Sequence, residues 1–429
     1  LLIAIDCGTR AIGPIRYART LGVDVLVCDH HEPGEELPAV VAMLNPKQAG
    51  DGYPFQGLSG CGIGFKLLQG LAQKGYVAEE RLRAHVDLVA ISTAADIVPM
   101  LDENRVLTFL GLSQLQGTQH VGLQVLCEQI ERRNLYTVSG IVFGIAPCLN
   151  AAGRLRHAQH ALSLLLATDR TDAKKGVALL GADNEERKAL DRALFEEAVE
   201  QVVVTGQEAQ SSLLLFAPHW HKGILGIVAA RCVERYHKPT ILLTQQGDQA
   251  VGSARSVWGY NIYEGLKQCE ALLTAYGGHA YAAGLSLPVA HVDALREQLE
   301  AVVQRTITPE QQRPRQVIDV LIDLAEITPR FYAIIQRMRP FGPGFRQPVF
   351  ATQPVEVVGY DLYQERHLAL KVRQVGSRAV WRAIGFDMGH LLPLVAARKP
   401  VAIAYTVEKD SYAGRVRYEL FLKDIAPCF

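Results

Sequence analysis

Features typical of several protein classes are missing from this 429-residue sequence. Its eight cysteines are scattered without a C-x-x-C pair, which argues against a disulfide framework or a cysteine zinc site and predicts reduced thiols in the cytoplasm. No uninterrupted apolar run reaches the ~18 residues of a membrane-spanning helix, and no charged segment precedes a signal-type core. We therefore expect a soluble, cytoplasmic protein that has no membrane partner.

The chain also has no net charge at pH 7. Lys plus Arg and Asp plus Glu each number 44, so any nucleic-acid binding must come from local basic patches and not from a global basic field. The sequence also lacks a convincing Ser-His-Asp arrangement, but a metal-dependent hydrolase does not need a covalent nucleophile. What is present, 49% hydrophobic and 21% charged residues, is typical of a globular protein, and the length predicts about three domains.

Four segments with different patterns follow one another along the chain. Residues 1–125 alternate apolar strands with helices, which predicts a parallel α/β sheet, and residues 126–205 are helical. Residues 206–305 form a second α/β pattern, and residues 314–429 contain short strand-like runs that predict a small β-barrel. The chain begins at Leu1 inside an apolar strand, so we expect a fragment that lacks an upstream part.

Asp29-His30-His31 is the sharpest local signal, because it follows a predicted strand. A carboxylate beside imidazoles suits Mn²⁺ or another octahedral divalent ion, although paired histidines can equally make polar loop contacts. Asp6 ends the preceding predicted strand, and Asp96 follows the run DLVAIS, which we interpret as a third strand. Strand ends of a parallel sheet meet at one edge, so we expect these residues to lie together.

Phosphate-binding candidates lie in small-residue segments. Arg154 follows Asn150-Ala-Ala-Gly, where an arginine fork after a tight turn suits a phosphate, but a helix C-cap with a surface arginine fits equally well. The tracts 252–256 and 277–280 combine glycine with Ser, Arg or His, and either could be an ordinary turn. In the predicted barrel the residues that could contact a single strand of nucleic acid are Tyr360, Tyr363, Arg366, His367, Lys371, Arg373, Arg378 and Trp381.

Eight sequence segments carry a resemblance to a known family: IAIDCG, VCDHHEPG, AISTAADIVPM, APCLNAAGR, WHKGILGIVAAR, VGSARS, YGGHAYAAG and PFGPGFRQPVF. Together they resemble the DHH phosphoesterase family over essentially the whole chain. Their order and spacing are similar to the single-strand DNA exonucleases of the family and not to its shorter pyrophosphatase or oligoribonuclease members. The resemblance implies an α/β fold with four parts: a parallel-sheet DHH domain, a long connecting helix, an α/β DHH-associated domain and a C-terminal OB-like β-barrel.

The resemblance also implies a role for each candidate residue, around a two-metal site holding Mn²⁺ or Mg²⁺. The implied metal ligands are Asp6, His30 and Asp96. The implied catalytic residues are Asp29, His31, Arg154 and His279. The implied substrate-binding residues are Asn150, Ser253, Arg255, Ser256, Gly277 and Gly278.

The resemblance implies an enzyme that hydrolyses single-stranded DNA in the 5′-to-3′ direction during repair and recombination. It also implies a monomer whose protein partner would be single-strand binding protein or a helicase. Two departures accompany it. Family members carry an upstream D-x-D-G motif, which we expect to be missing here, so this fragment should hydrolyse little; and Cys148 stands where a basic residue is usual.

Two alternatives remain. A small-substrate phosphodiesterase for oligoribonucleotides or cyclic dinucleotides would not need the barrel. A non-catalytic scaffold of a replication complex would not need the metal ligands.

Overall fold

The computed structural model describes residues 1–130, 134–410 and 417–428. Residues 131–133 of the predicted connector, and residues 411–416 and 429 of the predicted barrel, lie outside the described residues. The chain divides into two compact units. The first unites residues 1–118, 132–142 and 316–429, and the second unites residues 119–131 and 143–315. The domain bounds expected from the sequence stay a prediction, and each unit is described by itself.

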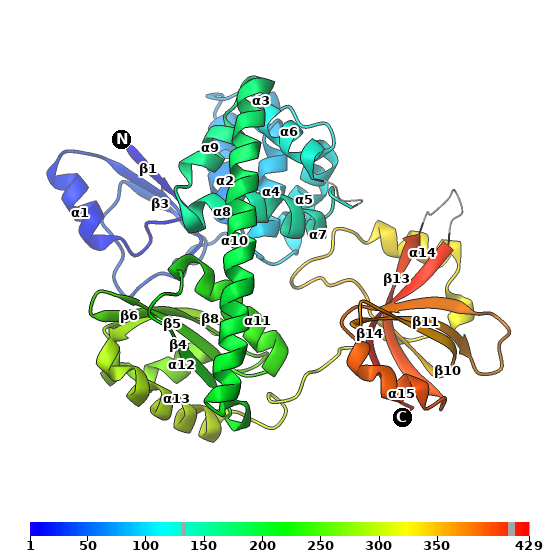
Figure 1. The fold of residues 1–429 in the computed structure, drawn as a ribbon. Coiled ribbons are helices and arrows are strands. Elements are labelled where there is room, and N and C mark those ends of the chain that lie inside the picture. Colours follow the sequence, from blue (N-terminus) through cyan, green and yellow to red (C-terminus); the bar gives the residue numbers. More distant parts are fainter. Residues whose placement is uncertain (131–133, 411–416, 429) are drawn as a thin grey trace. The chain divides into compact units, whose positions relative to one another are not determined.

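A small parallel sheet opens the first unit (Figure 1). Its strands are β1 (Leu2–Ile5), β2 (Val25–Cys28) and β3 (Ala42–Leu44), in the order β1-β2-β3. Helix α1 (Ile12–Thr20) buries Ile15 against Val25 and Val27. The central strand β2 is therefore the most buried one, and its carboxyl end leads directly into the DHH tripeptide.

Helices complete this domain. They are α2 (Gly60–Gln73), α3 (Glu79–Arg83), α4 (Val86–Ala95), α5 (Asp102–Leu115) and the single turn α7 (Val138–Gly140). The prediction that DLVAIS is a strand was wrong, because this run lies inside α4. The helix is buried on almost all sides, and a buried helix and a buried strand show the same continuous apolar run. Gly111 of α5 lets α4 approach, since a Cβ there would lie 2.4 Å from the Val86 carbonyl oxygen.

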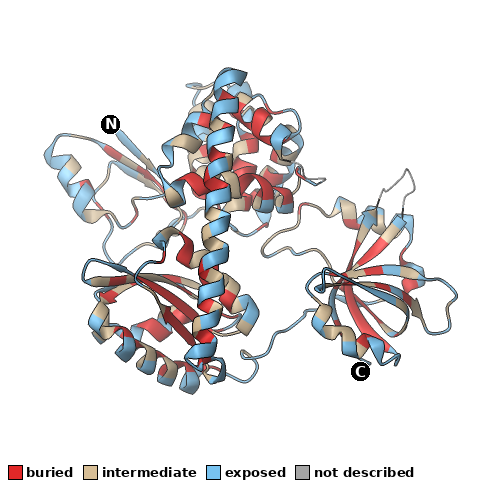
Figure 2. Ribbon diagram, in the orientation of Figure 1, coloured by how far each residue is buried: buried red, intermediate tan, exposed pale blue. Residues whose placement is uncertain are grey.

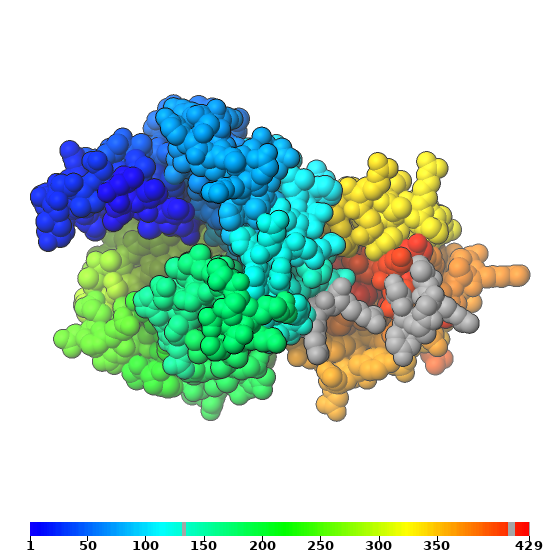
Figure 3. All heavy atoms as spheres, turned by 90° about the horizontal axis from the view of Figure 1, so that it is seen from above, coloured from blue at the N-terminus to red at the C-terminus, as the bar shows by residue number. Residues whose placement is uncertain are grey.

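The C-terminal part of the first unit is a closed β-barrel, a rounded body of yellow to red spheres in Figure 3. Its strands are β9 (Val320–Leu321), β10 (Phe350–Tyr363), β11 (His367–Gln374), β12 (Trp381–Gly385), β13 (Val401–Asp410) and β14 (Arg417–Pro427). The sheet order is β11-β12-β14-β13-β10-β9, and β10 also pairs with β11, which closes the ring. Helices α14 (Pro329–Arg337) and α15 (Leu392–Ala396) pack beside it, so the expected OB-like barrel is confirmed.

The segment that leads into the barrel packs against the start of α5. The Met100 amide donates to the Pro343 carbonyl oxygen at 2.6 Å, and Arg105 donates to the Met338 carbonyl oxygen at 2.8 Å. The Arg105 guanidinium also lies 4.6 Å from the centroid of the Phe345 ring. The loop between Asp96 and α5 is therefore held from the barrel side.

Helices make up the first half of the second unit, and one of them, α10, is long. They are α6 (Val121–Gln129), α8 (Ala146–Leu155), α9 (Gln159–Leu165) and α10 (Arg170–Val204). Residues of α10 are buried near both of its ends, whereas residues 185–193 are largely exposed (Figure 2). Helix α10 is the predicted long connecting helix. Among the described residues one helical stretch, Val138–Leu155, is long and apolar enough to cross a membrane; it is 39% buried, and one such stretch is weak evidence.

A mixed five-stranded sheet forms the rest of this unit. Its strands are β4 (Leu213–Phe216), β5 (Thr240–Gln246), β6 (Gln249–Arg255), β7 (Ala275–His279) and β8 (Ala282–Pro288), in the order β4-β5-β6-β8-β7. One face packs on α10 and α11 (Lys222–Tyr236), and the other on α12 (Ile262–Lys267) and α13 (Val292–Thr306). The expected α/β architecture of this segment is confirmed.

Candidate active site

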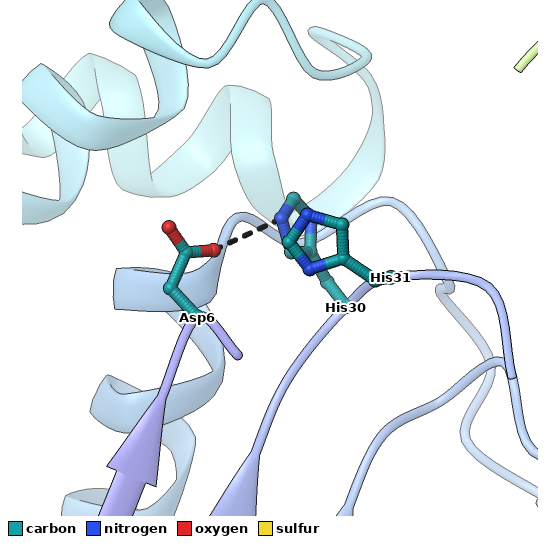
Figure 4. A group of neighbouring side chains, drawn as sticks. All are labelled: Asp6, His30 and His31. Atoms are coloured by element: carbon teal, nitrogen blue, oxygen red, sulfur yellow. Dashed lines mark ion pairs between the residues drawn. The ribbon is translucent and has the colours of Figure 1, made fainter. Parts of the chain in front are cut away.

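Asp6 and His30 meet at the carboxyl edge of the first sheet. Asp6 follows β1 and His30 follows β2 with one residue between, and their Oδ1 and Nε2 atoms lie 3.1 Å apart (Figure 4). The His30 side chain is only 12% exposed, whereas that of Asp6 is 60% exposed. Asp6 adopts a left-handed backbone with φ of 64°, which is uncommon for a residue other than glycine.

Asp96 reaches the same imidazole from a different element. It is the C-cap residue of α4, and its Oδ2 atom lies 3.4 Å from Nε2 of His30. The expected grouping of Asp6, His30 and Asp96 is therefore seen, but the third side chain comes from a helix end. His31 belongs to the group too, because ligand atoms of Asp6, His30 and His31 all lie within 4.8 Å of one another.

Asp29 supports this group by organising the DHH turn. Its side chain is 2% exposed, and its Oδ1 accepts from the His30 amide at 2.8 Å and lies 2.7 Å from Nδ1 of His31. Its Oδ2 accepts from the Thr9 amide at 3.0 Å. Because Nδ1 of His31 is engaged by Asp29, Nε2 is the ring nitrogen left for a metal ion, and carboxylates commonly orient ligating histidines in this way.

Three supporting residues were missed by the sequence reasoning, namely Thr9, Asn45 and Gly60. Asn45 donates to the Thr9 hydroxyl at 3.0 Å and to the His31 carbonyl oxygen at 2.9 Å, so it ties two loops together. Gly60, the first residue of α2, leaves room for the Asp6 carboxylate. The Gly60 contact has no counterpart in periodicity or composition, because it depends on how α2 meets the strand ends.

The electrostatics of the cluster follow from these contacts. The hydrogen bond to Asp6 raises the pKa of His30; burial opposes this and the Asp96 charge adds to it. Burial raises the pKa of Asp96, with a further rise from Asp6 against the opposing charge of His30. Burial alone would raise the pKa of Asp29, but hydrogen bonds from Thr9, His31 and the His30 amide outweigh it and hold that pKa below its ordinary value.

The donor set fits a divalent ion of the Mn²⁺ or Mg²⁺ type. Neighbouring ligand atoms of an octahedral ion at about 2.1 Å lie about 3.0 Å from each other. The Asp6–His30 and His30–Asp96 separations of 3.1 and 3.4 Å approach that value. Mixed carboxylate and imidazole donors also suit such ions. A hollow lined by Lys47, Phe55, Val98 and Leu101, among others, lies beside His30.

The phosphate-binding candidates belong to the second unit, where the alternative interpretation of the glycine tracts as ordinary turns was wrong. The tracts 252–255 and 277–279 are parts of strands β6 and β7. Arg255 pairs with Ala282 of β8, and Ala282 pairs with His279 of β7, so all three side chains point to one face. In the same way Ser253, Gly284 and Gly277 form the next row. The result is a nearly bare strip of sheet with Arg255 and Ser253 on one side and His279 on the other.

Arg154 lies in the last turn of α8, so the small-residue turn expected before it is helical. Asn150 is exposed one turn earlier on the same face of this helix, and Arg154 donates to the Gly223 carbonyl oxygen at 3.3 Å. Desolvation and Arg187 lower the pKa of Arg154, and desolvation and Arg154 lower the pKa of Arg255. In the described part of the chain these arginines form no ion pair with a carboxylate, so their charge is available to an anion.

Two further predicted contacts are bound within the protein. Ser256 donates its hydroxyl to the Tyr260 carbonyl oxygen at 2.8 Å. In the barrel Arg373 pairs with Glu356 at 2.6 Å, whereas Tyr363 is 56% exposed. Gly278 has a φ of 150°, and a Cβ there would lie 2.3 Å from the Ala282 carbonyl oxygen, so it serves the β7–β8 hairpin.

Comparison with known families matches three parts of the chain. The DHH family N-terminal domain matches residues 1–93, the DHHA1 domain residues 209–305, and the RecJ OB domain residues 318–424. A Salmonella typhimurium protein named single-stranded-DNA-specific exonuclease RecJ is 30% identical over 446 aligned positions, which cover all of this chain and 77% of that protein. The chain belongs to the RecJ family.

Other RecJ proteins agree in sequence and in fold. The Bacillus subtilis protein of the same name is 34% identical over 99% of this chain, and this chain spans about half (54%) of that relative's length. The crystal structure of RecJ in complex with Mn²⁺ from Thermus thermophilus superposes over the whole chain with a TM-score of 0.86 and 29% identity, covering 62% of that structure. A RecJ–Mg²⁺ structure from the same organism gives a TM-score of 0.80.

Proposed function

We propose that this chain is the catalytic core of a metal-dependent exonuclease that hydrolyses phosphodiester bonds of single-stranded DNA from the 5′ end. One observation carries the proposal: Nε2 of His30 lies within 3.4 Å of carboxylates from two separate elements, in a chain of the RecJ family. The RecJ relatives named above are called single-stranded-DNA-specific exonucleases. The 5′ polarity, and a role in repair and recombination, rest on the family resemblance.

In this proposal Asp6, His30 and Asp96 hold Mn²⁺ or Mg²⁺, which when bound polarises the phosphodiester and activates water at neutral pH. Asp29 keeps His31 oriented toward the ion. Residues of the second unit bind phosphates of the strand, namely Asn150, Arg154, Ser253, Arg255, Ser256, Gly277, Gly278 and His279. No side chain has to act as a covalent nucleophile.

The presence of the barrel favours single-stranded DNA over a small molecule as the substrate. OB folds bind single strands through basic grooves and aromatic side chains, which a dinucleotide does not need. We further propose that the protein works as a cytoplasmic monomer, and that single-strand binding protein or a helicase supplies the strand. The ligands Asp6, His30 and Asp96 are all present, which favours an enzyme over a non-catalytic scaffold.

The test uses oligonucleotides labelled at the 5′ or the 3′ end, with Mn²⁺, as single strands and as blunt duplexes. Because the resemblance predicts an upstream D-x-D-G motif, the longest natural form of the protein is assayed beside the 429 residues. We expect mononucleotides from the 5′ end of single strands, abolished in His30→Ala while DNA binding persists. Unchanged hydrolysis in His30→Ala, or equal digestion of duplexes, would contradict the proposal, and binding without hydrolysis would indicate a scaffold.

A further inference from the structure

An exposed tryptophan follows the bare strip of sheet between Arg255 and His279, which is proposed to bind phosphates and is called the phosphate strip. Trp258 comes three residues after Arg255 and is 65% exposed, and Tyr281 follows His279 by two residues and is 50% exposed. Trp220 of the same unit is by contrast 5% exposed. A tryptophan that leaves most of its ring in water keeps a large apolar surface available for a ligand.

The backbone around these two rings is fixed by hydrogen bonds. The Ser256 amide donates to the Tyr281 carbonyl oxygen at 3.2 Å, and the Gly259 amide donates to the Tyr281 hydroxyl at 3.3 Å. Gly259 has a φ of 83°, which reverses the chain directly after Trp258, and its carbonyl oxygen accepts from Gln311 at 2.5 Å. Trp258 is therefore an exposed ring on an anchored turn, so ordering it around a ligand costs little backbone entropy.

A positive charge accompanies the ring. The Arg315 guanidinium lies 5.8 Å from the centroid of Trp258. The linker that carries it also holds Arg313, against the single acid Glu310 among residues 307–315. Aromatic rings with nearby arginines are the usual means by which proteins bind bases of a single strand whatever their sequence.

Position connects this group to the phosphate contacts. Three residues span at most about 10 Å, so the Trp258 ring lies within reach of a nucleotide whose phosphate is near Arg255. The Ser256 amide, between them, donates to the Tyr281 carbonyl oxygen, so one short segment carries both Arg255, a proposed phosphate contact, and an aromatic surface.

We propose that Trp258, together with Tyr281 and Arg315, is a base-stacking platform for single-stranded DNA beside the Arg255–His279 phosphate strip. The inference rests on the proposed function and deepens it, because it assigns the bases, and not only the phosphates, a binding surface in the DHHA1 domain. A base that stacks on the ring replaces water from its exposed face, whereas a strand without bases gains nothing there.

The experiment measures binding of the whole chain to a fluorescent oligothymidylate and to an abasic strand of equal length, by anisotropy without divalent metal. Trp258→Ala should weaken oligothymidylate binding about tenfold, as expected for one lost stacked base, while Trp258→Phe keeps most of the affinity. Abasic binding should be weak and unchanged by either variant. The slope of log affinity against log salt should also stay unchanged, because no charge is removed.

Tyr76→Ala is the matched control, since Tyr76 is an aromatic residue of the first unit with 76% exposure, and it should bind like the wild type. If Trp258→Ala binds oligothymidylate as tightly as the wild type, or loses equal affinity for the abasic strand, the platform is refuted while the proposed function stands. If the wild type binds neither strand, the proposed function fails and the platform with it. Circular dichroism of each variant confirms that it is folded.

Discussion

Asp6 and Gly60 are in direct contact: a Cβ at position 60 would lie 2.2 Å from Oδ1 and 2.5 Å from Cβ of Asp6. Gly60 is the first residue of α2, and the Ser59 hydroxyl caps this helix by accepting from the Gly62 amide at 3.2 Å. The capped helix start cannot retreat freely. Gly60 therefore sets where the Asp6 carboxylate can lie.

Gly60→Ala should displace Asp6 and weaken Mn²⁺ binding about 10- to 100-fold, which is the usual effect of losing a partner that positions a metal ligand. Mn²⁺ titration followed by electron paramagnetic resonance measures it. Gly70→Ala in the same helix is the control, because a Cβ there meets nothing within 4 Å. Equal Mn²⁺ affinity in the two variants would show that the contact does not position Asp6.

Metal affinity should rise with pH. The pKa of His30 is raised by Asp6, against burial and with help from Asp96, so near neutral pH a proton competes with the ion for Nε2. Mn²⁺ should bind more tightly at pH about 8 than at pH about 6, on either side of the ordinary histidine pKa of about 6.5. Calorimetry in buffers of different ionisation enthalpy measures the released protons, and an affinity that is equal at both values would contradict the expectation.

Asp29→Asn should destabilise the fold in a pH-dependent way. The folded pKa of Asp29 is lowered, so its contribution is full above the unfolded value of about 3.9 and is lost as pH falls through the folded pKa. With metal chelated, we expect a loss of about 1.5–3 kcal/mol at pH about 7, from charged hydrogen bonds of a buried carboxylate. Urea unfolding at several pH values checks this; a difference that does not narrow in acid would argue against the ionised Asp29.

Arg154→Gln should reduce the salt dependence of DNA binding. If Arg154 contacts one phosphate of a single strand, its loss lowers the slope of log affinity against log salt by about 0.7, and adding Arg255→Gln lowers it by about 1.4. Binding is measured between about 50 and 200 mM salt. Lys175→Gln removes one charge from an exposed pair with Asp172 in the same unit and should leave the slope unchanged. A slope unaffected by Arg154→Gln would place this arginine away from the strand.

Sequence patterns predicted the candidate metal ligands better than the residues that position them. Asp6 and His30 follow short apolar strands, and parallel strands bring such ends together, so their meeting was predictable. Asp96 was grouped correctly for a wrong reason. Helix α4 is buried on almost all sides and has no distinct polar face, so no helical period marks it and a strand fits its sequence equally well.

The missed residues act through packing that a linear pattern does not encode. Asn45 lies 36 residues from Thr9, and its two hydrogen bonds exist only once β3 pairs with β2. For the glycine tracts of β6 and β7 the sequence left an ordinary turn open as an alternative, because a glycine that keeps a sheet face bare looks in sequence like one that reverses the chain. Their meaning appears only when the strand register places them in adjacent rows.

The backbone hydrogen bond between Met100 and Pro343 has a practical consequence for protein engineering. Residues 97–99 run from the α4 end that carries Asp96 to a backbone hydrogen bond with the segment preceding the barrel, and Ile97 already has a φ of 57°. A stretch fixed at both ends has no slack for extra residues, so an inserted tag or a deletion there would move a candidate metal ligand. The exposed turn at Gly75, where a Cβ would meet nothing within 4 Å, is a safer position for a fluorophore or an affinity handle.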